Sequence, residues 1–342
     1  MPRTGKISRA FFRDHIAPQL GADRAETTLG PRHGVDFGVL DIGGQALALA
    51  TDPVSILPGL GFERAARFAV RIVLADVAVS GLDPSHLAAG FTLPQDYGDD
   101  DFATVWTAIH DECASLGVDI VTGHTARYAG CSFPWVGAAT ALAVGDHEAV
   151  VRPDGARVGD DLIVTTGPAV EAASLFASLF PTEIDCDDDR LARVAAMLDE
   201  LDVVRDARAL APVDGVTAMH DITEGGLLGA LHEMAAGADA QFRVDSDRVP
   251  TDDDVATVCS TLEMDPWRAT SSGSMVVAVD PDSTAAVLDA LADRGTTAAV
   301  IGEVAAGTGV VRDGDSTDPP AGDASWPVYE ALRDAATDAD SG

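Results

Sequence analysis

Residues 215–235 read GVTAMHDITEGGLLGALHEMA, and this stretch decides the fold class. Its first part, 215–219, is a short apolar strand, and from Gly226 onward the apolar residues have helical spacing. Because glycine has no Cβ, the pair Gly225-Gly226 before the helix lets a phosphate or carboxylate approach the helix's first amides. The stretch therefore predicts a strand–loop–helix unit with an anion site. The alternative is a plain capped helix with Thr223 as its N-cap.

Strands and helices also alternate on both sides of this stretch. The sequence predicts strands at 35–41, 45–51, 87–93, 118–122, 136–144, 162–166, 215–219, 274–279 and 298–304. It predicts helices at 7–19, 62–80, 102–116, 189–211, 283–294 and 326–335, one from residue 226, and one opened by Gly167-Pro168 with proline in its first turn. Ile42-Gly43-Gly44 has the composition of a hairpin turn.

The chain of 342 residues is longer than one hydrophobic core usually allows. The polar segment around 151–161 marks the boundary between two α/β (α+β) domains. We expect an N-terminal domain at 1–152, a C-terminal domain at 153–310 and a loosely attached acidic tail at 311–342.

The chain is strongly acidic. It has 56 acidic and 22 basic residues, a formal net charge of −34, and Lys6 is its single lysine. Such a field repels phosphate backbones, which argues against nucleic-acid binding. Salt relieves the self-repulsion, since molar salt shortens the Debye length to about 3 Å. Acidic runs such as Asp99-Asp100-Asp101 therefore predict a halophilic protein.

Missing motifs exclude several common classes of protein. The sequence has no apolar stretch long enough to span a membrane and a charged N-terminus, which predicts a cytoplasmic protein. Its four cysteines form no CxxC pair, so neither a zinc site nor a disulfide framework is expected. The motifs GxxxxGK[ST], GxGxxG after a strand, and GxSxG are absent. A nucleotide enzyme with this sequence would hold phosphates by carboxylates, a metal ion and backbone amides.

Three aspartates stand in apolar surroundings, where carboxylates are costly. Asp36 begins a strand, Asp52 ends the apolar strand 46–50, and Asp76 interrupts an apolar helix. Because lysine is almost absent, arginine or a divalent cation must compensate them, and Mg²⁺ binds carboxylates together with nucleotide phosphates. The residues alone leave plainer roles open: a helix-face acid for Asp76 and a turn residue for Asp52.

A second candidate anion site lies in the first half. Residues 120–125, Ile-Val-Thr-Gly-His-Thr, read as an apolar strand that runs into a Gly-His-Thr turn with exposed amides. The alternative is a hairpin with a hydrogen-bonding threonine. His124 and His220, each taken alone, are residues of a kind that is more often structural than catalytic.

Five motifs follow one another in the order of a known enzyme family. They are Asp36 in Gly-x-Asp-x-Gly, Thr51-Asp52, Ala75-Asp76-Val77-Ala78 before Ser80-Gly81, Gly123-His124-Thr125, and His220-Asp221-x-Thr-Glu-Gly-Gly. Together they resemble the AIR synthase-like family of ATP-dependent enzymes, which includes thiamine-phosphate kinase, selenophosphate synthetase and the hydrogenase-maturation factor HypE. Residues 271–275 and 298–304 look most like those of HypE and its archaeal relatives.

The resemblance implies a PurM-like fold with ATP and Mg²⁺ as cofactors. The N-terminal sheet would close a barrel with that of a second subunit across a homodimer, and the C-terminal domain would be α/β. By family pattern, Asp36, Asp52 and Asp76 would hold the metal. The residues that would bind the nucleotide are these three with Thr51, Gly123, His124, Thr125, Thr223, Gly225 and Gly226. The residues that would be catalytic are His220, Asp221 and Glu224.

The resemblance leaves the acceptor unassigned. HypE carries a cysteine at its extreme C-terminus, whereas the last cysteine here is Cys259, so the HypE reaction lacks its carrier. We expect an ATP-dependent phosphotransferase or dehydratase-like enzyme that acts on a small-molecule or protein-borne acceptor, as in hydrogenase maturation. The alternatives are a non-catalytic nucleotide-binding assembly partner, and an AIR synthase or thiamine-phosphate kinase proper.

Overall fold

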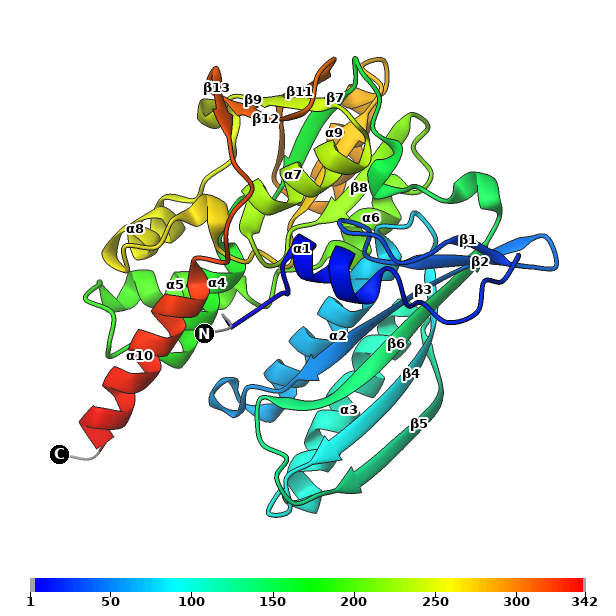
Figure 1. Cartoon of the computed structure of the whole chain (residues 1–342). Helices are drawn as coiled ribbons and strands as arrows, with labels where there is room; N and C mark the ends of the chain where they lie inside the picture. The colour runs from blue at the N-terminus through cyan, green and yellow to red at the C-terminus, as the bar shows by residue number, and fades with distance from the viewer. Residues whose placement is uncertain (1–3, 341–342) are drawn as a thin grey trace. The chain divides into compact units, whose positions relative to one another are not determined.

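The computed structural model describes residues 4–340, which form two compact units (Figure 1). The N-terminal unit contains residues 23–31 and 36–150, and the C-terminal unit contains 4–22, 32–35 and 151–340. The chain passes from one unit to the other at residues 150 and 151, beside the boundary that the polar segment predicts. The sequence did not predict that residues 4–22 and the loop 32–35 belong to the C-terminal unit.

The sheet of the N-terminal unit has the strand order β1-β2-β3-β6-β4-β5. The strands are β1 (Thr27–Leu29), β2 (Gly38–Ile42), β3 (Gln45–Ser55), β4 (Pro84–Leu93), β5 (Asp119–Arg127) and β6 (Trp135–Gly145). All neighbours are antiparallel except β4 and β5. The expected turn is confirmed: Gly43 and Gly44 have φ of 66° and 91° and join β2 to β3.

Two helices, α2 (Phe62–Ala78) and α3 (Asp99–Leu116), cover one face of this sheet (Figure 1). In β3 the side chains of Ala46, Ala48 and Ala50 are buried while Thr51 is exposed, because side chains of a strand alternate between faces. Asp52 therefore points to the helix-covered face and Thr51 to the other.

The sheet of the C-terminal unit has the order β13-β12-β9-β11-β7-β10-β8. The strands are β7 (Asp161–Thr165), β8 (Val216–Asp221), β9 (Gln241–Val244), β10 (Met275–Val279), β11 (Ala298–Ala305), β12 (Gly309–Arg312) and β13 (Asp315–Thr317). Only β12 and β9 pair in parallel. Every residue of β10 is buried, which places the core on both faces of the sheet.

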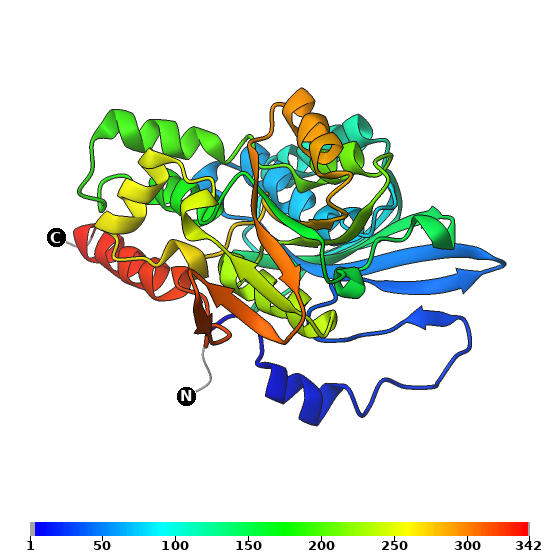
Figure 2. The same ribbon diagram turned by 90° about the horizontal axis from the view of Figure 1, so that it is seen from above.

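Helices lie on both sides of this second sheet (Figures 1 and 2). The helices of this unit are α1 (Arg9–Phe11) with a π-helix (Phe12–Ile16), α4 (Val170–Leu179), α5 (Asp188–Met197), α6 (Val203–Leu210), α7 (Gly226–Gly237), α8 (Asp253–Thr261), α9 (Thr284–Arg294) and α10 (Ser325–Asp340). The side chains of Leu227, Leu231 and Met234 in α7 share a buried apolar cluster with Val276 and Ala278 of β10. This packing fixes the start of α7 against the end of β8.

Four expectations about the elements were wrong. The tail is not loose, because 309–317 form β12 and β13, and Tyr329 of α10 stacks on Phe176 with ring centroids 6.4 Å apart. The single helix expected at 189–211 is two helices, with Asp202 as N-cap of the second. Pro168 lies before α4, which begins only at Val170. The sequence missed β9 and α8, which are short. Among residues 4–340, no helix is both long and apolar enough to cross a membrane.

Candidate active site

Strand β8 ends in two buried ionisable residues, His220 and Asp221, which are 1% and 2% exposed. Oδ1 of Asp221 accepts no hydrogen bond from any described residue. The nearest cationic atom recorded for it is Nδ1 of His220, at 3.7 Å. A buried carboxylate oxygen without a donor is costly unless a ligand or cation completes it. Asp221 is therefore the strongest single candidate for a ligand contact in the C-terminal unit.

The loop after Asp221 is built around two glycines with left-handed backbone. Gly225 (φ 94°) is the N-cap of α7, and Gly226 has φ 64°. A Cβ on Gly226 would lie 2.7 Å from the carbonyl oxygens of both Trp267 and Ala269, so its surroundings also require glycine. No side chain caps α7, so the reading of Thr223 as N-cap was wrong.

One amide of this loop already donates a hydrogen bond to an acidic side chain, that of Asp323. The N–H of Gly225 donates to Oδ2 of Asp323 over 2.7 Å, and Oδ1 of Asp323 accepts from the N–H of Ser325 over 2.7 Å. A carboxylate at a helix N-terminus is favoured by the amides and by the helix dipole. The predicted preference of Gly225 for an anion is thus met here by Asp323, a residue that the sequence did not single out.

The ring of His220 lies between two hydrogen-bond acceptors. Its Nδ1 is 2.7 Å from the carbonyl oxygen of Asp221, and its Nε2 is 3.1 Å from Oε2 of Glu233 on α7. The carbonyl oxygen can only accept, so Nδ1–H donates to it, and Nε2 faces the carboxylate of Glu233.

Glu233 gathers three basic groups around one carboxylate. Besides His220, its Oε1 lies 3.6 Å from Nζ of Lys6 and 3.7 Å from Nε2 of His33. Burial alone would raise the pKa of Glu233, but the hydrogen bond from His220 and the charges of Lys6, His220 and His33 lower it to about 2. Glu233 is therefore ionised at any pH at which the protein works.

A second buried carboxyl, Glu171 at the start of α4, lies on the loop 270–274. Its Oε2 accepts from Oγ1 of Thr270 over 2.7 Å and from the N–H of Ser272 over 2.6 Å. Burial raises the pKa of Glu171 to about 7, and the charge of Asp323 adds to the rise. This carboxyl can change its protonation near neutral pH, as acid–base groups of active sites do.

The three aspartates expected to bind metal lie in the N-terminal unit, and each is half-buried. Asp36 precedes β2, Asp52 lies in β3 facing the helices, and Asp76 lies in the last turns of α2. Thr51 faces the opposite side of the sheet, where its hydroxyl is 2.9 Å from that of Thr140 on β6. The sheet thus separates Thr51 from Asp52, its neighbour in the motif.

Residues 123–125 do not form the expected turn. Gly123, His124 and Thr125 lie in the middle of strand β5 and pair in parallel with Ala89, Gly90 and Phe91 of β4. The strand continues because a Cβ at Gly123 would approach the carbonyl oxygen of Ala89 to 2.4 Å, and glycine is what allows this close pairing. Nε2 of His124 lies 3.3 Å from the hydroxyl of Tyr128.

Comparison with known protein families identifies the family of this chain. Residues 34–143 match the N-terminal domain of AIR synthase related proteins, and residues 157–314 match the C-terminal domain. The chain belongs to the AIR synthase-related family. This confirms the resemblance read from the five motifs, and it places the loop at 225–226, residues 123–125 of β5 and all three aspartates inside the matched domains.

Similar members of the AIR synthase-related family have different activities. A putative hydrogenase expression/formation protein of Methanocaldococcus jannaschii is 24% identical over 87% of this chain and 88% of its own length. A thiamine-monophosphate kinase of Halobacterium salinarum is 33% identical over 71% of this chain and 77% of its own length. Among solved structures, HypE of Escherichia coli superimposes with a TM-score of 0.72 at 25% identity, over 82% of this chain and 88% of that one.

The donor groups of this family member fit Mg²⁺ better than they fit a softer metal. Carboxylates are the only ionisable groups in the predicted metal set, and Mg²⁺ prefers oxygen donors. Oδ1 of Asp221, buried and without a described donor, is a further oxygen suited to a cation or a ligand proton. No cysteine belongs to the set, and Cys113 and Cys259 are buried elsewhere.

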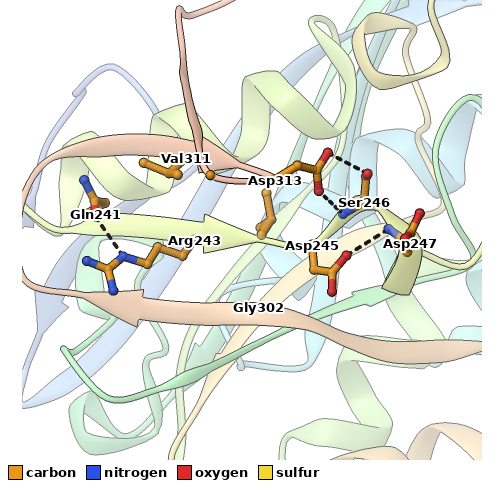
Figure 3. A pocket seen from close by; sticks show the side chains of 10 residues that line it. Gln241, Arg243, Asp245, Ser246, Asp247, Gly302, Val311 and Asp313 are labelled. Carbon is orange, nitrogen blue, oxygen red and sulfur yellow. Dashed lines mark hydrogen bonds between the residues drawn. The ribbon is translucent and has the colours of Figure 1, made fainter.

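A separate hollow of about 940 Å³ lies over β9, β11 and β12 (Figure 3). Its polar side chains bond within the hollow: Asp313 accepts from the N–H of Ser246 over 2.8 Å, and Arg243 donates to Gln241 over 2.9 Å. It contains none of the predicted site residues.

Sequence reasoning missed three residues of the site, Glu171, Glu233 and Asp323. Glu233 did carry a signal, since it is the one acidic residue of the largely apolar helix α7. Asp323 could not have been found, because it lies 98 residues from the Gly225 amide that it accepts from.

Proposed function

We propose that this chain is a Mg²⁺- and ATP-dependent enzyme that phosphorylates or activates an acceptor, as a phosphotransferase or a dehydratase-like enzyme. The observation that carries the proposal is the end of β8: a buried Asp221 oxygen without a described donor, followed by a Gly-Gly turn at the start of α7. Membership of the AIR synthase-related family supports it, because similar members include a thiamine-monophosphate kinase and HypE, a carbamoyl dehydratase.

The residues take the following roles in this proposal. Asp36, Asp52 and Asp76 hold Mg²⁺, which when bound neutralises charge on the nucleotide phosphates. Gly123, His124 and Thr125 line the nucleotide site on the N-terminal unit, and Thr51, on the opposite face of the sheet from Asp52, is left out of it. Gly225 and Gly226 let a phosphate approach the start of α7, with Thr223 and Glu224 beside them, and the amide of Gly225 becomes a donor to it once Asp323 has left. Asp221 accepts a proton or hydrogen bond from the acceptor, and His220 orients Asp221.

The contact between Asp323 and Gly225 sets a condition on this mechanism. The N–H of Gly225 can bind a phosphate oxygen only after the carboxylate of Asp323 has left it. The same contact favours the alternative function, a nucleotide-binding assembly partner without turnover, if Asp323 never leaves.

Release of ADP distinguishes the two functions. Purified protein in molar KCl is given ATP and Mg²⁺, with thiamine monophosphate as one candidate acceptor, and ADP is followed by a coupled assay. The enzyme proposal expects ADP release that Asp221→Asn abolishes and that Asp119→Asn, an exposed acid on β5, leaves intact. Nucleotide binding with no ADP release for any acceptor would favour the assembly partner.

We also propose that the N-terminal sheet pairs with that of a second copy, in a homodimer. Val121 on β5 and Trp135 and Val144 on β6 are exposed to 51%, 51% and 48%, which is unusual for large apolar side chains of one sheet. Light scattering after size exclusion in molar KCl tests this, and a mass of one chain contradicts it. The cytoplasmic location and the halophilic character of the protein remain predictions.

A further inference from the structure

We infer that residues 318–340, the C-terminal strap, regulate the candidate nucleotide site, because the carboxylate of Asp323 competes with a nucleotide phosphate for the N–H of Gly225. The strap consists of a short loop followed by α10 (Figure 1). It lies beyond residue 314, where the match to the C-terminal domain of the family ends. This regulation rests on the proposed function, since the phosphate that the strap excludes is that of the nucleotide.

The N–H of Gly225 is the amide of the Gly-Gly turn at which an anion binds. The N–H of Gly226 donates to the carbonyl oxygen of Thr223 over 3.0 Å, so it is used within the loop. The N–H of Gly225 donates instead to Oδ2 of Asp323, 98 residues away, over 2.7 Å. A carboxylate and a phosphate each bring an anionic oxygen to such an amide, and two anions at one N–H repel each other. The docked strap and a nucleotide phosphate therefore exclude each other at Gly225.

The beginning of the strap is ordered around this contact. Oδ1 of Asp323 accepts from both the N–H and the hydroxyl of Ser325, which orients the carboxylate toward the loop. The next residue, Ala324, donates its N–H to the carbonyl oxygen of Arg268 over 2.9 Å. Asp323 is only 9% exposed, so water competes little for its oxygens. The carboxylate thus leaves Gly225 only when this part of the strap moves with it.

Aromatic side chains anchor the strap at a second place. The ring of Tyr329 on α10 lies against Phe176 of α4 and against Phe180 at the end of α4, with ring centroids 6.4 and 5.8 Å apart. Trp326 packs edge-on against Tyr329 at 6.1 Å. The strap is therefore held both at Asp323 and at Tyr329, and loss of either contact should favour its release.

Docking of the strap also has costs, which make it reversible. In the docked state, Nε1 of Trp326 and Nε of Arg268 are buried and have no hydrogen-bond partner among the described residues. A buried donor without a partner is destabilising. The strap also carries six acidic residues and one basic residue in a protein of net charge −34, so like charges oppose its docking. These costs weaken docking enough for a nucleotide to displace the strap.

Calorimetric titration with a non-hydrolysable ATP analogue and Mg²⁺ in molar KCl tests the competition. The apparent affinity falls with the fraction of the protein whose site is open, and one hydrogen bond to a charged group changes that fraction by about tenfold. We expect Asp323→Ala to bind the analogue about tenfold more tightly than the wild type. Asp334→Ala is the matched control and should bind like the wild type, because Asp334 is 71% exposed on the same helix and pairs with Arg333.

Two further measurements follow the strap without changing Asp323. Tyr329→Leu removes the aromatic contacts with Phe176 and Phe180 and should also tighten binding of the analogue, whereas a purely structural cap at Gly225 predicts no change. Amide hydrogen exchange uses the wild type, so it does not depend on the folding of a variant. Peptides from 323–337 should exchange faster when the analogue is bound, because the displaced strap loses its protection.

The outcomes separate this inference from the proposed function. If the wild type binds the analogue and Asp323→Ala binds it no more tightly, the competition is refuted and the proposed function stands. Exchange in 323–337 that the bound analogue slows or leaves unchanged refutes displacement of the strap, and unchanged affinity in Tyr329→Leu refutes the part played by α10. If neither the wild type nor Asp323→Ala binds the analogue, the proposed function fails and the regulation with it. Binding by Asp323→Ala alone supports both.

Discussion

Glu171 should make the stability of this protein fall as the pH rises toward neutrality. Burial raises the pKa of Glu171 from 4.5 to about 7, so the folded protein binds this proton more tightly than the unfolded chain does. The stabilising contribution is complete below about pH 4.5, is lost between about pH 4.5 and 7, and is constant above. This rise in the pKa of Glu171 corresponds to about 3 kcal/mol of unfolding free energy.

Glu171→Gln isolates this effect. Glutamine keeps an oxygen for the N–H of Ser272 and the hydroxyl of Thr270, but it cannot ionise. Urea unfolding is measured from pH 4.5 to 8.5 in molar KCl for both proteins. The variant should gain about 3 kcal/mol relative to the wild type across this range.

The difference curve between the two proteins removes the titration of the other acids. Glu200→Gln, which removes an exposed carboxylate, is the matched control. A difference between wild type and Glu171→Gln that stays constant from pH 4.5 to 8.5 would refute the reasoning, because it would mean that burial does not hold the proton on Glu171.

Three further predictions concern the same loops. The lowered pKa of Glu233 gives the wild type a stability that is present above about pH 4.5 and disappears as the pH falls toward about 2. Glu233→Gln cannot titrate, so it should lose less stability than the wild type below pH 4.5. Acid unfolding curves of the two proteins check this. Gly226→Ala should lower the free energy of unfolding in urea more than Gly295→Ala does. Both glycines have positive φ, where alanine costs about 1–2 kcal/mol, but only at position 226 would the added Cβ also clash with two carbonyl oxygens. Gly123→Ala should lower the melting temperature by parting β5 from β4, and an unchanged melting temperature contradicts the close pairing.

Short sequence patterns predicted most of the secondary structure, because the spacing of apolar residues and the preferences of turn residues depend on neighbours in the chain. The helix at 62–80 was predicted from its apolar spacing and is α2 (Phe62–Ala78). The Gly43-Gly44 turn was predicted from its composition, and both glycines have positive φ. The prediction was wrong at Gly123, where glycine serves close strand pairing. A sequence shows that a glycine is present but does not show which neighbour requires it.

The candidate site was predictable only where its residues lie in one segment. His220, Asp221 and the glycines of 225–226 are adjacent in the chain, so their motif was visible. Lys6 and Glu233 meet across more than two hundred residues, and no pattern in one sequence reports such a contact. Hence the loop was found from the sequence, but the charges that surround it were not.

Calorimetric titration of the protein with a non-hydrolysable ATP analogue and Mg²⁺ in molar KCl tests the central claim most directly. The account predicts Mg²⁺-dependent binding that is lost in Asp52→Asn and kept in Asp119→Asn, which changes an exposed acid at the start of β5. Equal heats for wild type and Asp52→Asn, or no binding with Mg²⁺ present, would contradict the claim that these carboxylates hold a metal-bound nucleotide.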